Sequence, residues 1–246
     1  MERLKIIADG ITDIGRARRA NQDKICLFPQ WNIFVVADGM GGHVGGGVAS
    51  GISVDTIHRY FADSRDLNLL PSERLLSAVR EANLEIAGKG ARDKKYLGMG
   101  TTIVALLIDG MTAHVAHVGD SRAYIIRDAG IRQITSDHSL VNQYVGNGLI
   151  TKEQAKGHPL KNVLTRALGM SGNIDVDITS LQIEPDDIFI LCSDGLTNMI
   201  EDEDILNTVI SCGDDIHLAG RTLVNLANNS GGEDNISVVI VKCTEA

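Results

Sequence analysis

The sequence is short of cysteine and aromatic residues, and it has no long apolar run. Its four cysteines stand far apart with no Cys-x-x-Cys pair, which excludes a disulfide framework and a cysteine-based zinc site. The longest apolar runs, such as 33–37 and 103–108, are far shorter than the roughly 20 residues that cross a membrane. Residues 1–11 carry four charged side chains and lack the apolar core of a signal peptide. We therefore expect a cytoplasmic protein that does not enter a membrane.

Positive charge is also scarce. Against 32 Asp and Glu residues stand 23 Lys and Arg, a net charge of −9, and only 4% of the residues are aromatic. Binding to a phosphate backbone needs a basic face, so this balance excludes nucleic acid as the expected partner. The acidity has two interpretations at this stage: carboxylates gathered around metal cations, or an ordinary acidic surface.

Apolar residues are plentiful, at 43% of the chain, and they come in short blocks. β-Branched or alternating runs predict strands at 4–12, 33–37, 101–108, 112–118, 123–127, 188–191 and 236–241. Short turn signals such as Asp109-Gly110 favour antiparallel hairpins. Helical periodicity is found at 45–61, 72–87, 202–210 and 214–227. Strand blocks separated by helix blocks predict an α+β fold, and with no linker or repeat we expect a single domain, residues 1–246.

The stretch from Asp137 to Gly169 differs from its surroundings. It is polar and helix-like, lies between two strand-rich blocks, and contains Thr151-x-x-Gln154, a sequence typical of a helix capping box. Long connections in compact domains are usually functional or disordered. The segment is therefore either a surface excursion beside a site or a plain connection with two short helices.

Four apolar strands each carry an aspartate at one tip, beside glycine or another small residue. Asp38 follows 33–37, Asp120 follows 112–118, Asp194 follows 188–192, and Asp234 precedes 236–241. Asp-Gly alone is typical of a plain turn. These strands are apolar on both faces, however, so their tips lie near the core, where gathered carboxylates stay ionised only with compensation. Mg²⁺ and Mn²⁺ prefer oxygen ligands, so the four together favour a carboxylate metal site over independent turns.

Three arginines stand close together upstream, at Arg16, Arg18 and Arg19, and a polar cluster ending at Asp23 follows them. In an acidic protein such a group suits an anion clamp, because guanidinium matches phosphate oxygens in a bidentate way. A solvated surface turn explains the segment alone equally well.

The ordered set of motifs resembles the metal-dependent protein phosphatases of type 2C, the PPM family, and is most similar to their compact bacterial members. The motifs run from about Thr12 to Val241: Arg18…Asn21-Gln22-Asp23, Asp38-Gly39-Met40-Gly41-Gly42-His43, Gly98-Met99-Gly100-Thr101-Thr102, Val118-Gly119-Asp120-Ser121-Arg122, Ser136-Asp137-His138-Ser139, Leu164-Thr165-Arg166-Ala167-Leu168-Gly169, Ser193-Asp194-Gly195 and Glu233-Asp234-Asn235.

This resemblance implies an α-β-β-α sandwich, two packed antiparallel sheets flanked by helix pairs, with residues 137–169 as a small helical flap. It implies hydrolysis of phosphoserine and phosphothreonine in proteins by a metal-activated water, in opposition to a eukaryotic-like Ser/Thr kinase. The cofactors would be two Mn²⁺ or Mg²⁺ ions, with a third site in bacterial relatives. We expect phosphorylated proteins as partners, and a cognate Ser/Thr kinase is one candidate. We expect the protein itself to be a monomer.

The resemblance also assigns the metal ligands. Asp38 would bridge the two ions, with the Gly39 carbonyl on one of them, and Asp194 and Asp234 would hold the other. Asp120, together with Asp194, matches the third-metal site.

The remaining roles lie around these ligands. Asp23 would anchor metal-bound waters, and Arg18 matches the arginine that binds the substrate phosphate. Some eukaryotic relatives have histidine directly after Asp-Gly as a candidate general acid, whereas this chain has Met40. His43 could serve instead, although a helix-entry hydrogen bond is an equally good account of this histidine. Metal-bound water could also protonate the leaving group.

Two other functions belong to the same pattern. A pseudophosphatase, which binds phosphoproteins without cleaving them, would lack one or more metal aspartates, and none is missing here. A phosphatase of an anti-sigma antagonist usually carries extra sensor domains, for which 246 residues leave no room. The physiological substrate, the choice between Mn²⁺ and Mg²⁺, and the general acid stay open.

Overall fold

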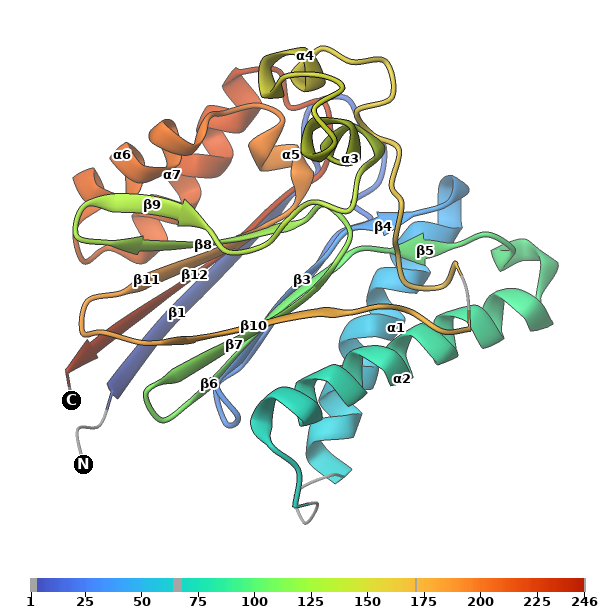
Figure 1. The fold of residues 1–246 in the computed structure, drawn as a ribbon, viewed down its shortest axis with the longest axis horizontal. Helices are drawn as coiled ribbons and strands as arrows, with labels where there is room; N and C mark the ends of the chain where they lie inside the picture. The colour runs from blue at the N-terminus through green and yellow to red at the C-terminus, as the bar shows by residue number, and fades with distance from the viewer. Residues whose placement is uncertain (1–3, 64–67, 171, 246) are drawn as a thin grey trace.

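Two five-stranded antiparallel sheets lie face to face in the computed structural model, which describes residues 4–63, 68–170 and 172–245 (Figure 1). The first has the order β1-β12-β11-β8-β9 and the second β10-β7-β6-β3-β2, while β4 and β5 form a small separate pair. The strands are β1 (Leu4–Asp13), β2 (Lys24–Phe28), β3 (Ile33–Ala37), β4 (Gly39–Met40), β5 (Gly100–Thr101), β6 (Ile103–Asp109), β7 (Thr112–Val118), β8 (Arg122–Arg127), β9 (Gly130–Gln133), β10 (Asp177–Gln182), β11 (Ile188–Cys192) and β12 (Ile236–Glu245).

Helices cover the outer face of each sheet. The pair α1 (Gly42–Asp63) and α2 (Pro71–Arg92) packs on the second sheet, followed by the 3₁₀ turn η1 (Lys94–Tyr96). The first sheet carries α5 (Asp194–Thr197), α6 (Asp202–Cys212) and α7 (Ile216–Asn229). Within the described ranges, no helix is apolar over the length that a membrane crossing requires.

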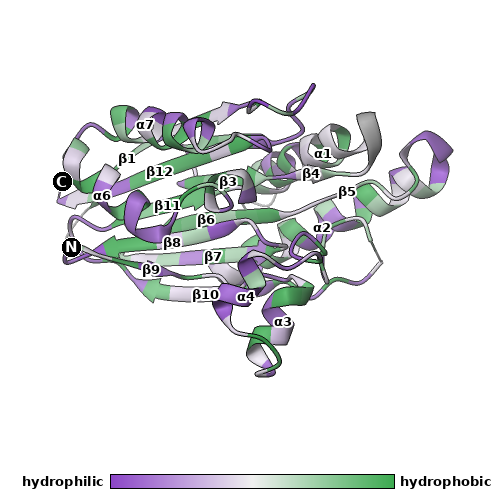
Figure 2. Cartoon of the chain, turned by 90° about the horizontal axis from the view of Figure 1, so that it is seen from above, coloured by the Kyte–Doolittle hydropathy of each residue, from purple (hydrophilic) through white to green (hydrophobic). Residues whose placement is uncertain are grey.

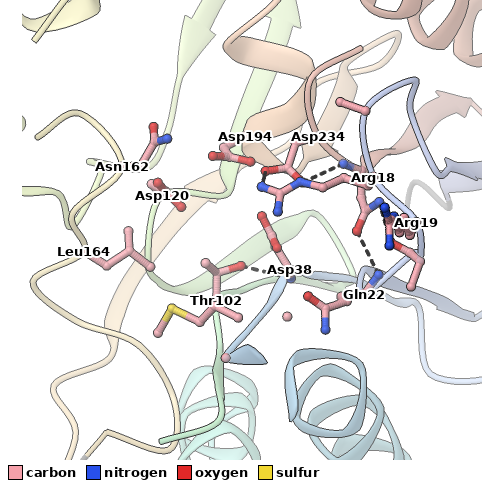
Figure 3. Close-up of a pocket in the computed structure, with 16 residues that line it drawn as sticks. Arg18, Arg19, Gln22, Asp38, Thr102, Asp120, Asn162, Leu164, Asp194 and Asp234 are labelled. Atoms are coloured by element: carbon pink, nitrogen blue, oxygen red, sulfur yellow. Dashed lines mark hydrogen bonds and ion pairs between the residues drawn. The ribbon is translucent and has the colours of Figure 1, made fainter. Parts of the chain in front are cut away.

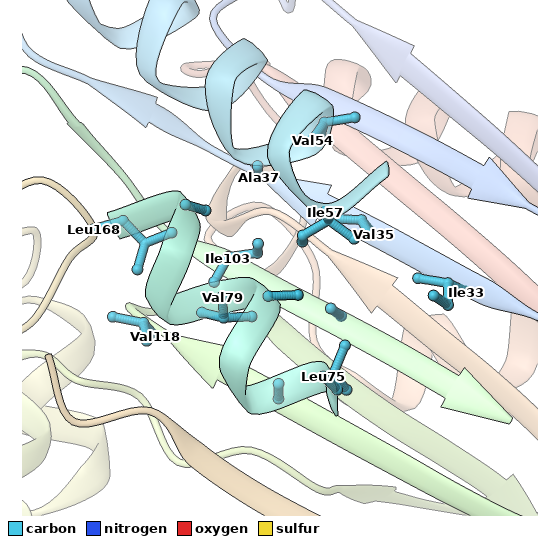
Figure 4. Packing of buried hydrophobic residues seen from close by; sticks show 14 of the residues in the cluster. Ile33, Val35, Ala37, Val54, Ile57, Leu75, Val79, Ile103, Val118 and Leu168 are labelled. Atoms are coloured by element: carbon cyan, nitrogen blue, oxygen red, sulfur yellow. The ribbon is translucent and has the colours of Figure 1, made fainter. Parts of the chain in front are cut away.

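Apolar side chains form three layers, one between the two sheets and one between each sheet and its helices. Strand β3 shows how they arise. Successive strand side chains point to opposite faces, so Phe34 and Val36 enter the layer between the sheets, while Ile33, Val35 and Ala37 meet the α1–α2 pair (Figure 4). Figure 2 shows the apolar colour concentrated along the strands, with hydrophilic residues on the outer helices. Strands that are apolar on both faces are therefore central strands buried between a sheet and a helix layer, and the expected α-β-β-α sandwich is confirmed.

The predicted strands are all present, but four others were missed: β2, β4, β9 and β10. β4 is only two residues long, and β9 and β10 are edge strands with several polar residues, as in the Asp177–Gln182 sequence DITSLQ, so their apolar signal is weak. β2 is also an edge strand, but its sequence KICLF contains a short apolar run that could have been recognised. The predicted strand 101–108 is divided, because Gly100–Thr101 pairs with β4 and β6 begins only at Ile103. The helix expected from 214 begins at Ile216, where Asp215 caps it by accepting from the Leu218 N–H.

Residues 137–169 lie in the connection between β9 of the first sheet and β10 of the second. They contain the two short helices α3 (Leu140–Gly146) and α4 (Lys152–Lys156). Thr151 and Gln154 form the capping box at the start of α4, as predicted. The two ends of the segment are joined by a bridge between Ser139 and Leu164, which makes a narrow neck.

Candidate metal and phosphate site

The four strand-tip aspartates meet at one end of the sandwich. The strand directions explain this: β3 and β7 both run antiparallel to β6 and end on the same side, and β12 begins where its antiparallel neighbour β11 ends. A cavity of about 580 Å³ lies at this end, and the aspartates point into it (Figure 3). Its lining includes Arg18, Asp38, Gly39, Asp120, Asp194 and Asp234. All six sequence-predicted residues of the metal and phosphate set are thus brought together.

Asp38 is held in place through its backbone. Its N–H donates to the Thr102 hydroxyl at 3.1 Å, and its carbonyl accepts from the Thr102 N–H and the Thr101 hydroxyl, both at 2.8 Å. Gly39 then allows a close approach to α1, because a Cβ there would lie 2.2 Å from the Gly46 carbonyl oxygen. The Asp38 carboxylate is thereby directed into the cavity, and a side chain other than hydrogen does not fit at position 39.

Asp23 lies behind the cavity wall, only 2% exposed. Its Oδ2 accepts hydrogen bonds from the hydroxyls of Ser193 at 2.8 Å and Ser237 at 2.7 Å. Its Oδ1 is buried and has no hydrogen-bond partner among the described residues, and the same holds for Oδ1 of Asp194. Buried carboxylate oxygens without partners are costly, so these two atoms call for a cationic neighbour.

The electrostatics of the site point the same way. Burial raises the pKa of Asp38 well above its usual range, and the charges of Asp23 and Asp194 raise it further. Burial raises the pKa of Asp23 to about 7. The pKa of Asp120 rises to about 8 through burial and the nearby charge of Asp194. The protein alone therefore does not support these carboxylates as anions at neutral pH.

Divalent metal ions fit this set of residues. The cavity lining contains four carboxylates and neither Cys nor His among the described residues, a set of oxygen ligands that suits Mg²⁺ and Mn²⁺ rather than softer metals. The described residues contain one other group with suitable ligand atoms, His117, His138 and Asp177, and it lies outside the cavity lining.

The three arginines separate in the structure. Arg16 donates from Nε to the Asn228 carbonyl at 3.0 Å and fixes the loop. Arg18 turns into the cavity, where Nη2 donates to Oδ2 of Asp234 at 2.6 Å, while Arg19 lies along the cavity edge (Figure 3). One basic cluster therefore contains a structural residue and two residues that face the site.

Several supporting residues had no role assigned from the sequence. Asn235 donates to the carbonyls of Ile14 and Ala20 and accepts from the Gln22 N–H, so it holds both ends of the arginine loop. Thr102 also shares a hydrogen bond of 2.7 Å with Ser121. Ser121 and Asn235 directly follow Asp120 and Asp234 in the sequence, and that adjacency is the signal that could have found them, whereas Thr102 has no such neighbour. The side chain of His43, the candidate general acid, lies outside the described residues.

Comparison with known proteins gives a consistent result. Residues 16–221 match the family described as Protein phosphatase 2C. The chain is 39% identical over 241 residues to the Serine/threonine phosphatase stp of Listeria welshimeri, covering 94% of this chain and 93% of the relative. It is 38% identical over 240 residues to the Protein phosphatase PhpP of Streptococcus pneumoniae, covering 96% of both.

Solved structures agree. The Mycobacterium tuberculosis serine/threonine phosphatase PstP/Ppp superposes with a TM-score of 0.89 at 33% identity, over 98% of this chain and 99% of that one. The catalytic domain of the phosphatase PstP, solved in complex with two manganese ions, superposes with a TM-score of 0.88 at 32% identity, over 98% and 100% of the two chains. This chain belongs to the protein phosphatase 2C family.

Proposed function

We propose that this protein hydrolyses phosphoserine and phosphothreonine in other proteins with the help of two Mn²⁺ or Mg²⁺ ions. One observation carries the proposal: four aspartates from both sheets converge on a cavity that also contains the Arg18 guanidinium. Two buried carboxylate oxygens there have no partner among the described residues. The relatives named as serine/threonine phosphatases support the same reaction.

Asp38, the Gly39 carbonyl, Asp194 and Asp234 would hold the two ions, and Asp120 with Asp194 would hold a third. When bound, the pair supplies a nucleophilic water at neutral pH and neutralises charge on the phosphoryl group. Arg18 lies beside these carboxylates, because its Nη2 donates to Oδ2 of Asp234 at 2.6 Å (Figure 3). Asp23 stands behind them, fixed by Ser193 and Ser237, and would accept hydrogen bonds from water through its unpartnered oxygen.

Arg18 would bind the phosphate of the substrate. Its guanidinium faces the cavity and is 54% exposed, so it is within reach of an incoming anion. A planar guanidinium can hold two phosphate oxygens at once, which orients the phosphorus for in-line attack. Asn235 contributes indirectly, because it fixes the loop that carries Arg18.

The segment 137–169 would act as a flap over one side of the site. Asn162 and Leu164 from this segment line the cavity together with Asp120. Residues of the phosphoprotein that flank the phosphorylated side chain would contact it. His43 and water remain the two candidates for the general acid, and a Ser/Thr kinase that supplies the phosphoprotein is the expected counterpart.

The test is hydrolysis of a phosphothreonine peptide by the purified protein, with Mn²⁺ and with excess chelator. We expect turnover with Mn²⁺ and none with chelator, and Asp38→Ala should have none in either condition. Full activity in chelator would contradict the proposal. Tight binding of Mn²⁺ and phosphopeptide without turnover would instead identify a phosphoprotein-binding module.

Arg19→Ala is a matched control for Arg18→Ala. Both remove one positive charge from the same loop, but only Arg18 makes the hydrogen bond to Asp234 inside the cavity. We expect KM to rise strongly for Arg18→Ala and little for Arg19→Ala. Equal effects would show that general charge, rather than a specific phosphate contact, determines binding.

A further inference from the structure

A second polar cluster, outside the cavity lining, lies where the neck of segment 137–169 meets the sheet. We call it the His138 cluster; it consists of His117, His138, Arg166 and Asp177. The two imidazole rings stack with centroids 4.4 Å apart, and both histidines are buried, at 4% and 8% exposure. Nε2 of His138 lies 3.3 Å from Oδ2 of Asp177, and Arg166 donates to Oδ1 of Asp177 at 2.8 Å.

The hydrogen bonds fix the protonation of the His138 ring. The backbone N–H of Gly119 points at Nδ1 over 3.1 Å, and a backbone N–H can only donate, so Nδ1 is the acceptor. The single proton of the neutral ring is then on Nε2, where Asp177 accepts it. Burial lowers the pKa of His138, although the hydrogen bond with Asp177 raises it. The lowered pKa keeps the ring neutral.

This protonation argues against a metal ion in the cluster. A histidine that binds metal through one ring nitrogen normally donates a proton from the other. Here the other nitrogen accepts from Gly119, so Nε2 has no lone pair for a cation. The Arg166 guanidinium also lies 3.3 Å from Nε2, in the position a cation would need. The cluster is therefore a hydrogen-bonded structure rather than a metal site.

His138 holds Gly119 through both the N–H and the carbonyl of that residue. Besides the bond to Nδ1, the Gly119 carbonyl accepts from the backbone N–H of His138 at 2.8 Å. Gly119 has φ +112, and a Cβ there would lie 2.6 Å from Thr102, so this peptide is also confined on its other side. The next residue is Asp120, whose carboxylate lines the cavity. The other end of the neck is joined to His138 as well, because the Thr165 N–H donates to the His138 carbonyl at 2.8 Å.

We propose that His138 is a positioning residue that orients the Asp120 carboxylate toward its metal ion. Through His138, this orientation is also linked to the position of the neck of segment 137–169. This inference rests on the proposed role of Asp120 as a metal ligand. The Nδ1 contact with Gly119 is the essential link, whereas the Nε2 contact with Asp177 only orients the ring. The two contacts can be removed separately, because asparagine places an oxygen where Nδ1 lies and glutamine places an N–H where Nε2 lies.

The experiment compares His138→Asn with His138→Gln by calorimetric titration with Mn²⁺ alone, with Asp120→Asn as a reference. We expect His138→Gln to raise the dissociation constant of the weakest Mn²⁺ site by about 10-fold or more, the range found when groups that orient metal ligands are removed. His138→Asn should bind Mn²⁺ about as tightly as the wild type, because its side-chain oxygen keeps an acceptor for the Gly119 N–H. Thermal unfolding of both variants records whether they fold equally well.

Each contrary outcome has a distinct meaning. Equal weakening in both variants, or none in His138→Gln, would overturn the positioning role of Nδ1. If Asp120→Asn itself leaves Mn²⁺ binding unchanged, the ligand assignment fails and this inference fails with it. Should the glutamine variant not fold, long-range ¹H–¹⁵N spectra of the wild-type protein decide the matter. A proton on Nε2 of His138 supports the proposal, and a proton on Nδ1 overturns it.

Discussion

Asp23→Asn should stabilise the metal-free protein while damaging its function. Asp23 is buried, and one of its carboxylate oxygens has no partner among the described residues. The asparagine oxygen can still accept hydrogen bonds from the Ser193 and Ser237 hydroxyls, and the amide NH₂ group takes the place of the unpartnered carboxylate oxygen. The substitution therefore removes a buried charge and keeps the hydrogen bonds that the structure shows.

The size of the effect follows from the pKa of Asp23, which burial raises from 3.8 to about 7. A raised carboxyl pKa means that the folded state holds its proton longer, so stability falls as pH rises from about 4 through about 7. At roughly 1.36 kcal/mol per pH unit, the raised pKa of Asp23 lowers the free energy of unfolding by about 4 kcal/mol at pH 8 and by about 2 kcal/mol at pH 5, where the folded state keeps its proton and the unfolded state has lost it. The advantage of Asp23→Asn should therefore grow by about 2–3 kcal/mol between these pH values.

Urea unfolding in excess chelator measures this, with the single tryptophan as reporter. Trp31 packs against Phe28 and Phe61 at the far end of β3 from Asp38, so its fluorescence reports unfolding and not the site. Asp55→Asn, at an exposed position of α1, is the control, because it makes the same substitution away from the buried site. A stability difference for Asp23→Asn that is constant with pH, or that favours the wild type at pH 8, would refute the reasoning. With Mn²⁺ added, the wild type should regain the advantage.

Three further predictions concern other parts of the molecule. Arg18→Ala should raise KM for a phosphothreonine peptide about 10-fold or more, the equivalent of one charge-assisted hydrogen bond, and steady-state kinetics in Mn²⁺ would check it. Arg127→Met should lower the free energy of unfolding by about 3 kcal/mol, because it leaves the fully buried Asp187 carboxylate without its bidentate partner; activity per folded molecule should not change. Gly39→Ala should lose Mn²⁺ binding in calorimetry, since its Cβ would strike the backbone of α1, whereas Gly51→Ala, with open space around it, should gain about 0.5–1 kcal/mol in urea unfolding.

The sequence was most informative where apolar runs and aspartates coincide. The run 33–37 predicts both the buried strand β3 and the position of Asp38, because a strand that is apolar on both faces must be central. β11 and β12 are antiparallel neighbours, so the end of one and the start of the other lie at the same edge, which brings Asp194 and Asp234 together. Asp38 meets them from the other sheet, and that meeting depends on how the two sheets pack.

What could not be predicted depends on contacts between distant segments. Nothing in the local pattern at Asn235 shows that it fastens the loop at Ile14 and Ala20, and the edge strand β10 has too few apolar residues to stand out. Arg16 and Arg18 look alike in the sequence, yet one fixes the loop and the other faces the cavity. The difference arises only when the loop docks against Asn228 and Asp234.

The convergence of Asp38 with Asp194 and Asp234 has a mechanical consequence for the whole sandwich. Asp38 ends a strand of one sheet, whereas the other two belong to strands of the opposite sheet, far away along the chain. A cation shared among them would act as a reversible cross-link between the two layers, in addition to the side-chain packing and the hydrogen bonds from Ser193 and Ser237 to Asp23. Loading the site would therefore suppress sliding of one sheet over the other and slow amide exchange along β3 and β11. Chelation would release this motion first at the pinned end.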